Sequence, residues 1–312
     1  MVEAQSEKQG WALKYHDAAQ IAHAIGHFNN ISDPETKLWT RDLTLDEQRF
    51  IQNERRLCAL DFRTYWLPRY AKIINWSKEP VHFVPNVAQN IILDLWAEDE
   101  ARGVAIWMQQ LKARRLGVST ISELNICHRY QFQPYANCVV ASGDPDRSVE
   151  MAGMIKFALD SQPWWLLPTV TKVKRGIPIE FGELHSTLSI EAGNQFAAVS
   201  RGSAPNIIHL SELIEWQDAA ELIDGGLLPA VIDDANVFGI LESTGGVGWW
   251  QDKWIQVKRD FARGTGRIRP VFLPWYVGTD IYPSPADLRK RPIPANWIPS
   301  DRAGGSFRCE VR

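Results

Sequence analysis

The sequence predicts an α/β protein with a mainly parallel central sheet flanked by helices and a small antiparallel annex. Short apolar runs recur along the chain, as expected of strands buried on both faces of a parallel sheet. Helical sequence follows two of these runs, and residues 162–200 alternate polar and apolar residues between glycine turns, which predicts the antiparallel strands. The apolar runs are residues 104–108, 136–144, 207–210 and 237–241.

Composition favours a soluble globular protein. The 312 residues include 45% hydrophobic and 23% charged residues, and no run of roughly 18 uncharged apolar residues predicts a membrane span. The N-terminus lacks the apolar core of a signal sequence. The four cysteines show neither metal-ligand nor disulfide spacing, which favours the cytoplasm. A net charge of -3 argues against constitutive tight DNA binding but permits a local basic face.

Residues 1–57 are expected to form a helical N-terminal extension. His16, His23 and His27 lie in alanine-rich sequence without an acidic partner, which favours a surface helix over a metal site. Thr44 and Glu47 have the spacing of a capping box that opens a helix. A second helical stretch, CALDFRTYWLPRYAKII, is expected to break near its proline.

The chain is organised around residues 104–120, VAIWMQQLKARRLGVST. An apolar strand, a basic turn with one glycine, and a helix that opens at Ser119 and Thr120 are the parts of a phosphate cradle. Gly117 and Ser119 match the second glycine and the hydroxyl of G-x-x-x-x-G-K-[ST], whereas Lys112 and Val118 replace its first glycine and lysine. The alternative is a buried strand that leads into a surface helix, with basic residues at the turn.

Two further strands end in residues suited to phosphate chemistry. The sequence NIIHLSELIEW places Ser211 and Glu212 at the carboxyl end of a buried strand, where open α/β sheets bind ligands. Ser211 stands where a metal-binding carboxylate is expected, and Glu212 is the candidate for polarising a water. A third strand ends in Glu242, Ser243, Thr244, Gly245 and Gly246, a turn in which hydroxyl groups and glycines can respond to a γ-phosphate.

The ordered set of motifs over roughly residues 58–276 resembles the ATPase domain of the large terminase subunit of tailed bacteriophages. The resemblance rests on K-A-R-R-L-G-V-S-T as a variant Walker A, on HLSE followed by Trp, on EST followed by glycine and aromatics, and on F-x-P-W. Gly245-Gly246 departs from the more frequent Asn-Gly. The resemblance implies a RecA-like P-loop core that hydrolyses ATP with Mg²⁺.

The resemblance also implies roles for individual residues. Gln89 would read adenine, the alternative being a glutamine without a ligand role, and Ser119 would bind Mg²⁺ with help from Ser211. Either Lys112 or Arg114 would replace the missing lysine. The expected nucleotide-binding residues are Gln89, Lys112, Ala113, Arg114, Arg115, Leu116, Gly117, Val118, Ser119 and Thr120; Glu212 and Arg114 are the catalytic candidates, and Glu242, Ser243, Thr244 and Gly245 form the coupling motif. An arginine finger could come from Arg114 in cis, or from Arg147 or Arg201 of a neighbouring subunit.

The implied partners are double-stranded DNA, a portal protein, a small terminase subunit and further copies in a ring on the procapsid, in the cytoplasm of the infected bacterium. Residues 277–312 are expected to be a proline-rich tail or linker toward a nuclease domain that this chain does not contain, so no nuclease activity is expected. Two alternatives stay open: another P-loop nucleic-acid motor, such as a helicase-type ATPase, and an idle P-loop scaffold, which Val118 and Ser211 favour.

Overall fold

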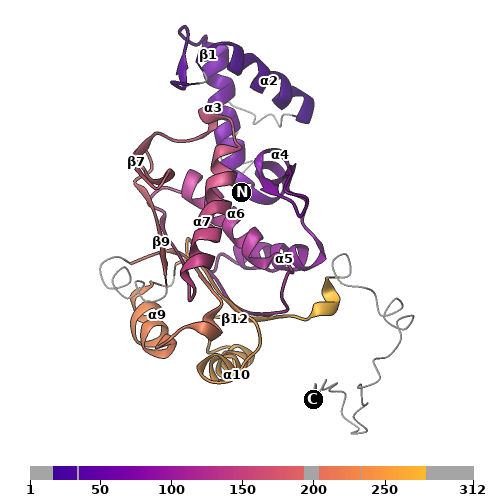
Figure 1. The fold of residues 1–312 in the computed structure, drawn as a ribbon, viewed down its shortest axis with the longest axis vertical. Coiled ribbons are helices and arrows are strands. Elements are labelled where there is room, and N and C mark those ends of the chain that lie inside the picture. The colour runs from indigo at the N-terminus through magenta and orange to yellow at the C-terminus, as the bar shows by residue number, and fades with distance from the viewer. Residues whose placement is uncertain (1–16, 34, 193–203, 233, 279–312) are drawn as a thin grey trace, which may run out of the picture.

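The computed structural model describes residues 17–33, 35–192, 204–232 and 234–278, and an eight-stranded sheet forms its centre (Figure 1). The strand order is β12-β5-β11-β10-β6-β9-β8-β7. Neighbours from β12 to β9 are parallel, and β8 and β7 continue the sheet in antiparallel fashion. The strands are β5 (Ile106–Lys112), β6 (Asn137–Ser142), β7 (Val170–Lys174), β8 (Ile177–Phe181), β9 (Ser186–Ala192), β10 (Ile207–Ser211), β11 (Phe238–Ser243) and β12 (Arg269–Leu273). The predicted mixed α/β class is confirmed.

Both faces of the sheet are covered by helices, which explains the apolar runs. Side chains alternate along each strand, so Ile207 of β10 joins the core on one face and Ile208 the core on the other. The first core contains residues of α3 (Leu45–Leu60), α5 (Val87–Ala101), α6 (Val118–Phe132) and α7 (Pro145–Asp160). The second contains residues of η5 (Ala220–Leu227) and α10 (Trp249–Ala262), and α9 (Leu228–Ala230) follows η5 directly.

The strand that precedes the glycine turn is longer than predicted. We expected residues 104–108, but β5 runs to Lys112, because pairing with β11 on one side and β12 on the other continues through Leu111. Gln109 and Gln110 are therefore fully buried strand residues, and Lys112 is the last strand residue rather than part of the turn. Tertiary pairing thus overrides the local polarity of this segment.

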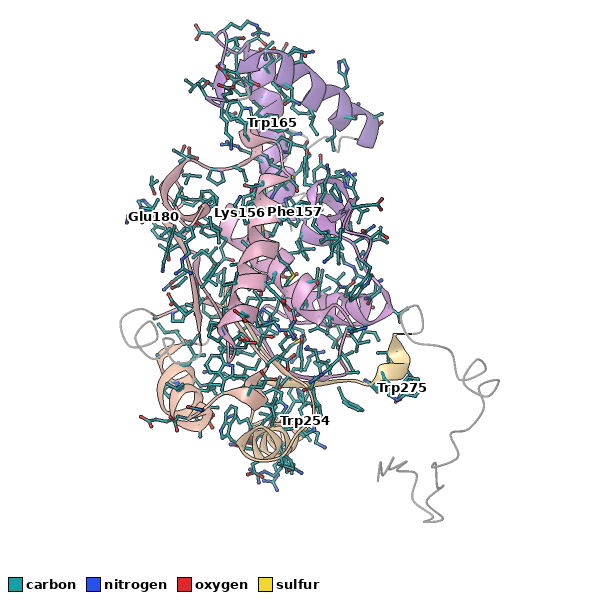
Figure 2. The ribbon with its side chains drawn as sticks, viewed as in Figure 1. Lys156, Phe157, Trp165, Glu180, Trp254 and Trp275 are labelled. Atoms are coloured by element: carbon teal, nitrogen blue, oxygen red, sulfur yellow. The ribbon has the colours of Figure 1, made fainter. Side chains whose placement is uncertain are left out.

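The expected helical N-terminal segment contains α2 (Ala18–Asn30) and the start of α3, and both helices open with capping boxes. The predicted pair of Thr44 and Glu47 is confirmed. The predicted boundary at residue 57 falls inside α3, which shares the first core. Trp165 connects this segment to the rest of the core, because its ring lies 5.1 Å from that of Phe28 (Figure 2). The short strands β1 (Ser32–Asp33) and β2 (Leu38–Trp39) join α2 to α3.

The stretch after α3 keeps helical turns across its proline and then becomes extended. A π-helical turn, η2 (Phe62–Trp66), leads into α4 (Leu67–Tyr70), where Pro68 stands in the first turn that tolerates proline. The helix we expected to resume is instead β3 (Lys72–Ile74), which forms a hairpin with β4 (Pro80–His82). Short 3-10 turns complete the described elements: η3 (Trp164–Leu166), η4 (Leu213–Glu215) and η6 (Trp275–Val277).

The predicted antiparallel annex is confirmed for residues up to 192, where β9 joins it to the parallel part of the sheet. Lys172 pairs with Glu180 across the β7–β8 hairpin, and Glu180 is labelled in Figure 2. Within the described parts of the chain, no helix is long and apolar enough to cross a membrane.

Candidate functional site

The carboxyl ends of β5, β11 and β10 lie side by side, and the polar residues predicted from sequence gather there. The loop of residues 113–117 joins β5 to α6, while Ser211 ends β10 and Ser243 ends β11. The strand β11 lies between the other two, which separates them by two strand spacings, on the order of 9–10 Å. This edge is where parallel sheets carry ligand-binding groups.

The loop before α6 is held from outside by the first turn of α5. Asn86 Nδ2 donates to the carbonyl oxygen of Leu116 over 3.1 Å, and Gln89 Nε2 donates to that of Gly117 over 2.7 Å. Gly117 has a φ of 71° and precedes the first residue of α6, where no side chain caps the helix. The amide groups of the first turn of α6 are therefore presented at this edge, as a phosphate-binding helix requires.

Gln89, the residue expected to read adenine, lies in the first turn of α5, and only 4% of it is exposed. Its Oε1 accepts from the Asn86 amide in a capping box, and its Nε2 reaches Gly117. Both ends of the side-chain amide thus make contacts within the protein.

A row of polar side chains crosses the sheet on the face that α6 covers. Glu242 of β11 is in register with Gln110 of β5, and Ser211 of β10 with Ser142 of β6. In-register residues of parallel strands point to the same face, so these groups are neighbours despite their distance in sequence. Gln110, Ser142, Ser211 and Glu242 are all at most 1% exposed.

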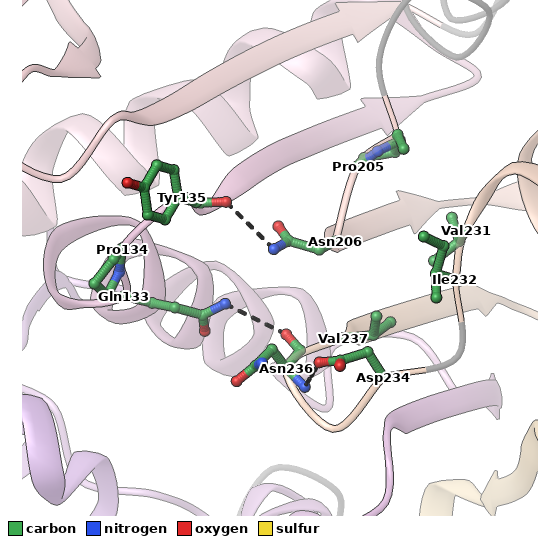
Figure 3. Close-up of a pocket in the computed structure, with 11 residues that line it drawn as sticks. Gln133, Pro134, Tyr135, Pro205, Asn206, Val231, Ile232, Asp234, Asn236 and Val237 are labelled. Atoms are coloured by element: carbon green, nitrogen blue, oxygen red, sulfur yellow. Dashed lines mark hydrogen bonds between the residues drawn. The ribbon is translucent and has the colours of Figure 1, made fainter.

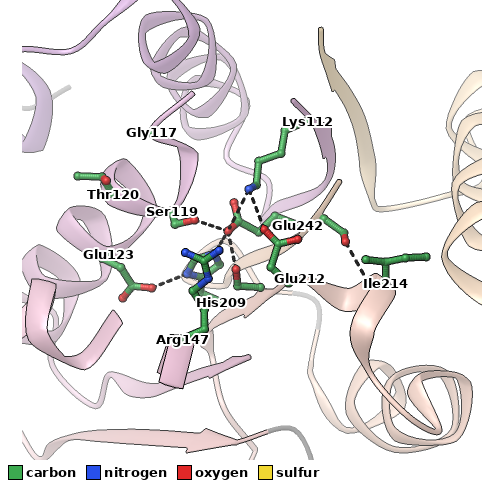
Figure 4. A network of polar contacts seen from close by, with 12 residues as sticks. Lys112, Gly117, Ser119, Thr120, Glu123, Arg147, His209, Glu212, Ile214 and Glu242 are labelled. Carbon is green, nitrogen blue, oxygen red and sulfur yellow. Dashed lines mark hydrogen bonds and ion pairs between the residues drawn. The ribbon is translucent and has the colours of Figure 1, made fainter. Parts of the chain in front are cut away.

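Glu242 is the centre of the polar network at this edge (Figure 4). Its Oε1 accepts hydrogen bonds from Ser119 Oγ over 2.5 Å and from Ser211 Oγ over 2.8 Å. His209 Nε2 lies 3.3 Å and Lys112 Nζ 3.9 Å from the same oxygen. The carboxylate that we assigned to a coupling turn is therefore a buried strand residue that connects the loop helix to β10.

Lys112 and Glu212 form the second part of the network. Lys112 Nζ lies 3.5 Å from Glu212 Oε1, and both side chains are about one-tenth exposed or less. Glu212 follows β10 in the left-handed conformation, with a φ of 51°. Such a conformation is uncommon outside glycine and is concentrated at functional sites. It turns the chain sharply at the end of the strand, where Glu212 faces Lys112.

Behind the network, Glu123 and His209 form a fully buried pair that the sequence analysis missed. His209 Nδ1 lies 2.6 Å from Glu123 Oε1, and neither side chain is more than 1% exposed. A signal existed in the sequence: Glu123 follows Ser119 by one helical turn, and His209 precedes Ser211 on the same face of its strand. Both therefore point toward the residues that were identified.

Electrostatic interactions within the network shift the pKa values of its buried groups. Burial disfavours ionisation of Glu242, but Lys112 and His209 outweigh it and lower the pKa of this carboxyl far below its ordinary value. Burial likewise opposes a charge on His209, yet Glu242 and Glu123 raise the pKa of the imidazole to about 9. Burial raises the pKa of Glu123, although His209 opposes the shift. The network thus keeps Glu242 ionised and His209 protonated at neutral pH.

The other predicted coupling residues follow Glu242. The strand β11 includes Glu242 and Ser243 and so ends two residues beyond the expected end at residue 241. Ser243 Oγ accepts from the backbone amide of Ile214 over 3.0 Å, which connects β11 to η4 behind Glu212. Thr244 and Gly245 come after the strand. A displacement of β11 would therefore strain or break this hydrogen bond to the segment that follows Glu212.

The basic residues proposed to contact phosphate differ in burial and location. Val118, which stands at the usual lysine position, is 1% exposed in the first core, whereas Lys112 is buried within the network. Arg114 and Arg115 are exposed in the loop, and the Arg115 guanidinium lies 5.9 Å from the ring centre of the exposed Trp76. Arg147 pairs with Glu150 at the start of α7 and is drawn with the network in Figure 4. Arg201 lies outside the described residues.

The donor set suits a cation that keeps most of its ligands as water and phosphate. Two hydroxyl groups and one carboxylate meet at Ser119, Ser211 and Glu242, and the second carboxylate oxygen, Glu242 Oε2, has no hydrogen-bond partner within the described residues. Mg²⁺ is typically bound by one or two carboxylates together with substrate phosphates. Among the described residues, no group of three His, Cys, Asp or Glu side chains has the arrangement of an all-protein metal site.

A pocket of about 520 Å³ lies at the opposite edge of the sheet, beside the amino ends of β6, β10 and β11 (Figure 3). Its walls include Gln133, Tyr135, Asn206 and Asn236. The Gln133 side chain donates to the carbonyl oxygen of Asn236, and the Asn206 side chain donates to that of Tyr135. We place the candidate site at the network instead, because open parallel sheets bind ligands at the carboxyl ends of their strands.

Comparisons with known proteins do not assign this chain to a family. The sequence matches no family model, and a search of curated proteins returns no significant match.

Proposed function

We propose that this chain hydrolyses ATP at the network between α6, β10 and β11. The observation that carries the proposal is the convergence on one buried carboxylate, Glu242, of Ser119 from the loop helix, Ser211 from β10 and Lys112 from β5. A loop that ends in an uncapped helix supplies amide donors for phosphate oxygens, and the network supplies a cation and carboxylates beside it. Phosphoryl transfer needs little beyond such positioned charges.

In this proposal each residue has a positioning or charge-stabilising role. The amides of residues 113–119 hold the β-phosphate, and Ser119 contributes its hydroxyl to the Mg²⁺ site. Lys112 replaces the absent lysine, a choice that its burial supports over the exposed Arg114. Glu212 orients the attacking water, and Mg²⁺ neutralises charge on the phosphates when it is bound. The left-handed backbone of Glu212 supports the role of this residue, because it holds the Glu212 carboxylate beside Lys112.

We further propose a RecA-like core and a role in packaging double-stranded DNA, as in the large terminase subunit of tailed bacteriophages. The order of the motifs along the chain supports this, and so does the placement of their strands, with β11 between β5 and β10. The proposed partners are a portal protein, a small terminase subunit and further copies of this chain in a ring. The proposed site of action is the cytoplasm of the infected host.

An idle P-loop scaffold is the second candidate. It is favoured by the ion pair between Lys112 and Glu212, because this pair engages the two side chains proposed to act on the phosphate and on the attacking water. Nucleotide binding without turnover would identify it.

The test is steady-state ATP hydrolysis over a wide range of protein concentration, with Glu212→Gln as the control. We expect the variant to bind ATP and to lose turnover. A specific activity that rises with concentration indicates an arginine supplied by a neighbouring subunit, worth on the order of 10³–10⁵ in rate. A constant specific activity indicates Arg114 in cis. Unchanged hydrolysis in Glu212→Gln, or no binding of nucleotide by the wild type, would overturn the assignment.

A further inference from the structure

The position expected to provide a metal-binding carboxylate is occupied by Ser211, which carries no charge. The structure brings a carboxylate to the same place from the neighbouring strand, since Ser211 Oγ donates to Glu242 Oε1 over 2.8 Å. The same oxygen accepts from Ser119 Oγ, the hydroxyl proposed to reach Mg²⁺, over 2.5 Å. One carboxylate oxygen thus touches both hydroxyl groups of the proposed metal site.

The second oxygen of this carboxylate gives an independent indication of a ligand. Glu242 is 0% exposed, and its Oε2 has no hydrogen-bond partner among the residues that the structure describes. A buried carboxylate oxygen without a donor is costly, and such groups are normally completed by an ion or an ordered water. The free oxygen belongs to the side chain that already holds Ser119 and Ser211.

The balance of charged side chains in the network also favours a bound cation. Lys112 lies 3.5 Å from a Glu212 oxygen and 3.9 Å from Glu242 Oε1, so one ammonium group faces two carboxylates. His209 lies between two carboxyl groups, 2.6 Å from Glu123 Oε1 and 3.3 Å from Glu242 Oε1. Two cationic side chains, Lys112 and His209, thus face three carboxyl groups, and a divalent cation would add positive charge beside Glu242.

We propose that Glu242 supplies the negative charge of the Mg²⁺ site in place of the carboxylate that is absent at position 211. The Ser119 hydroxyl donates a hydrogen bond to Glu242, which would leave the oxygen lone pairs of Ser119 available to a cation. Hydrogen-bonded partners of this kind orient metal ligands and raise their donor strength. This inference rests on the proposed nucleotide site and assigns to Glu242 a role distinct from coupling.

The experiment measures the affinity of the full chain for a fluorescent ATP analogue during titration with Mg²⁺, and again in excess EDTA. In Glu242→Gln, the apparent Mg²⁺ affinity of the protein–nucleotide complex is expected to fall about ten- to a hundredfold. Nucleotide affinity in EDTA is expected to stay near that of the wild type, because the loop and its helix are unchanged. Glu180→Gln, which removes a carboxylate from the β7–β8 hairpin away from the site, is the control and is expected to retain the Mg²⁺ dependence.

The double variant Glu242→Gln with Ser211→Asp moves the carboxylate to the adjacent strand and is expected to recover most of the Mg²⁺ affinity. Thermal unfolding verifies that each variant is folded, and the double variant replaces the single one if the latter unfolds. An unchanged Mg²⁺ dependence in folded Glu242→Gln, or a folded double variant without metal dependence, contradicts the role of Glu242 while leaving ATP binding intact. Failure of the wild type to bind nucleotide instead contradicts the proposed function.

Discussion

Gln89 Nε2 donates to the carbonyl oxygen of Gly117 over 2.7 Å, although 28 positions separate the two residues in the sequence. The contact connects the first turn of α5 to the residue that precedes α6. Asn86 supports the same loop through Leu116. The shape of the proposed phosphate loop therefore depends on a helix outside it, which leads to two predictions.

The first prediction concerns Gly117→Ala. A Cβ at this position would lie 2.4 Å from Gln89 Nε2, and the φ of 71° disfavours a side chain. Gly103 has a φ of 66° with nothing within 4 Å of an added Cβ, so Gly103→Ala isolates the backbone cost, about 1 kcal/mol. We expect Gly117→Ala to lose a further ~1–3 kcal/mol through the clash, measured by denaturant unfolding.

Gln89→Ala provides the control for this interpretation. In the double variant Gln89→Ala with Gly117→Ala, the clash is relieved, so the two destabilising effects should not add. Equal losses for the two single glycine variants would show that the contact with Gln89 has no steric consequence.

The second prediction separates the two roles of Gln89 in nucleotide binding. Because its amide already contacts Asn86 and Gly117, we expect Gln89→Ala to weaken ATP and GTP binding by the same factor, through the loop. Asn86→Ala removes a comparable loop contact and should behave alike. Titrations with both nucleotides measure the ratio of affinities. A selective loss of ATP binding in Gln89→Ala alone would instead support a direct contact with adenine.

The third prediction concerns the buried cation Lys112. Lys112→Met leaves Glu212 and Glu242 without their shared ammonium group, and removal of one partner of a buried ion pair typically costs about 3–5 kcal/mol. Lys172→Met is the matched control, because Lys172 pairs with Glu180 on the exposed hairpin and should contribute at most ~1 kcal/mol. Denaturant unfolding of both variants measures the difference. Similar losses would mean that Lys112 is not the charge that balances the network.

The sequence was sufficient for features that depend on neighbouring residues. The strand that ends at Ser211, the capping box at Thr44 and the helix after Gly117 all follow from local pattern, and all are present. The length of β5 was underestimated, because its last residues are polar and become strand only through β11 and β12.

The central role of Glu242 could not be derived from the sequence, because it depends on which strands are neighbours. Only when β11 lies between β5 and β10 does this carboxylate meet Lys112 and Ser211. The partnership of Glu123 with His209 has the same origin, since α6 must cross the strand that carries His209. Periodicity places Glu123 on the same side of its helix as Ser119 and His209 on the same face of its strand as Ser211, but it does not show that the two elements meet.

The fourth prediction is a pH dependence that arises from His128. Burial lowers the pKa of this imidazole to about 4, and its Nε2 donates to the carbonyl oxygen of Cys58 over 2.7 Å. Its ring packs among Phe62, Trp66 and Phe132, and only 7% of the residue is exposed. The native protein therefore holds His128 neutral at a pH where the unfolded chain already binds a proton.

The sign follows from this difference in proton binding. The unfolded chain takes up the proton near its ordinary pKa of about 6.5, so the free energy of unfolding falls as the pH drops from about 6.5 toward 4. The slope approaches ~1.4 kcal/mol per pH unit for one proton. His128→Gln keeps a donor for Cys58 and cannot be protonated, so its stability should fall less steeply over this interval. Denaturant unfolding of both proteins at a series of pH values measures the difference, and other titrating groups, His209 included, cancel in it. Parallel curves would show that His128 is protonated equally in the folded and unfolded states.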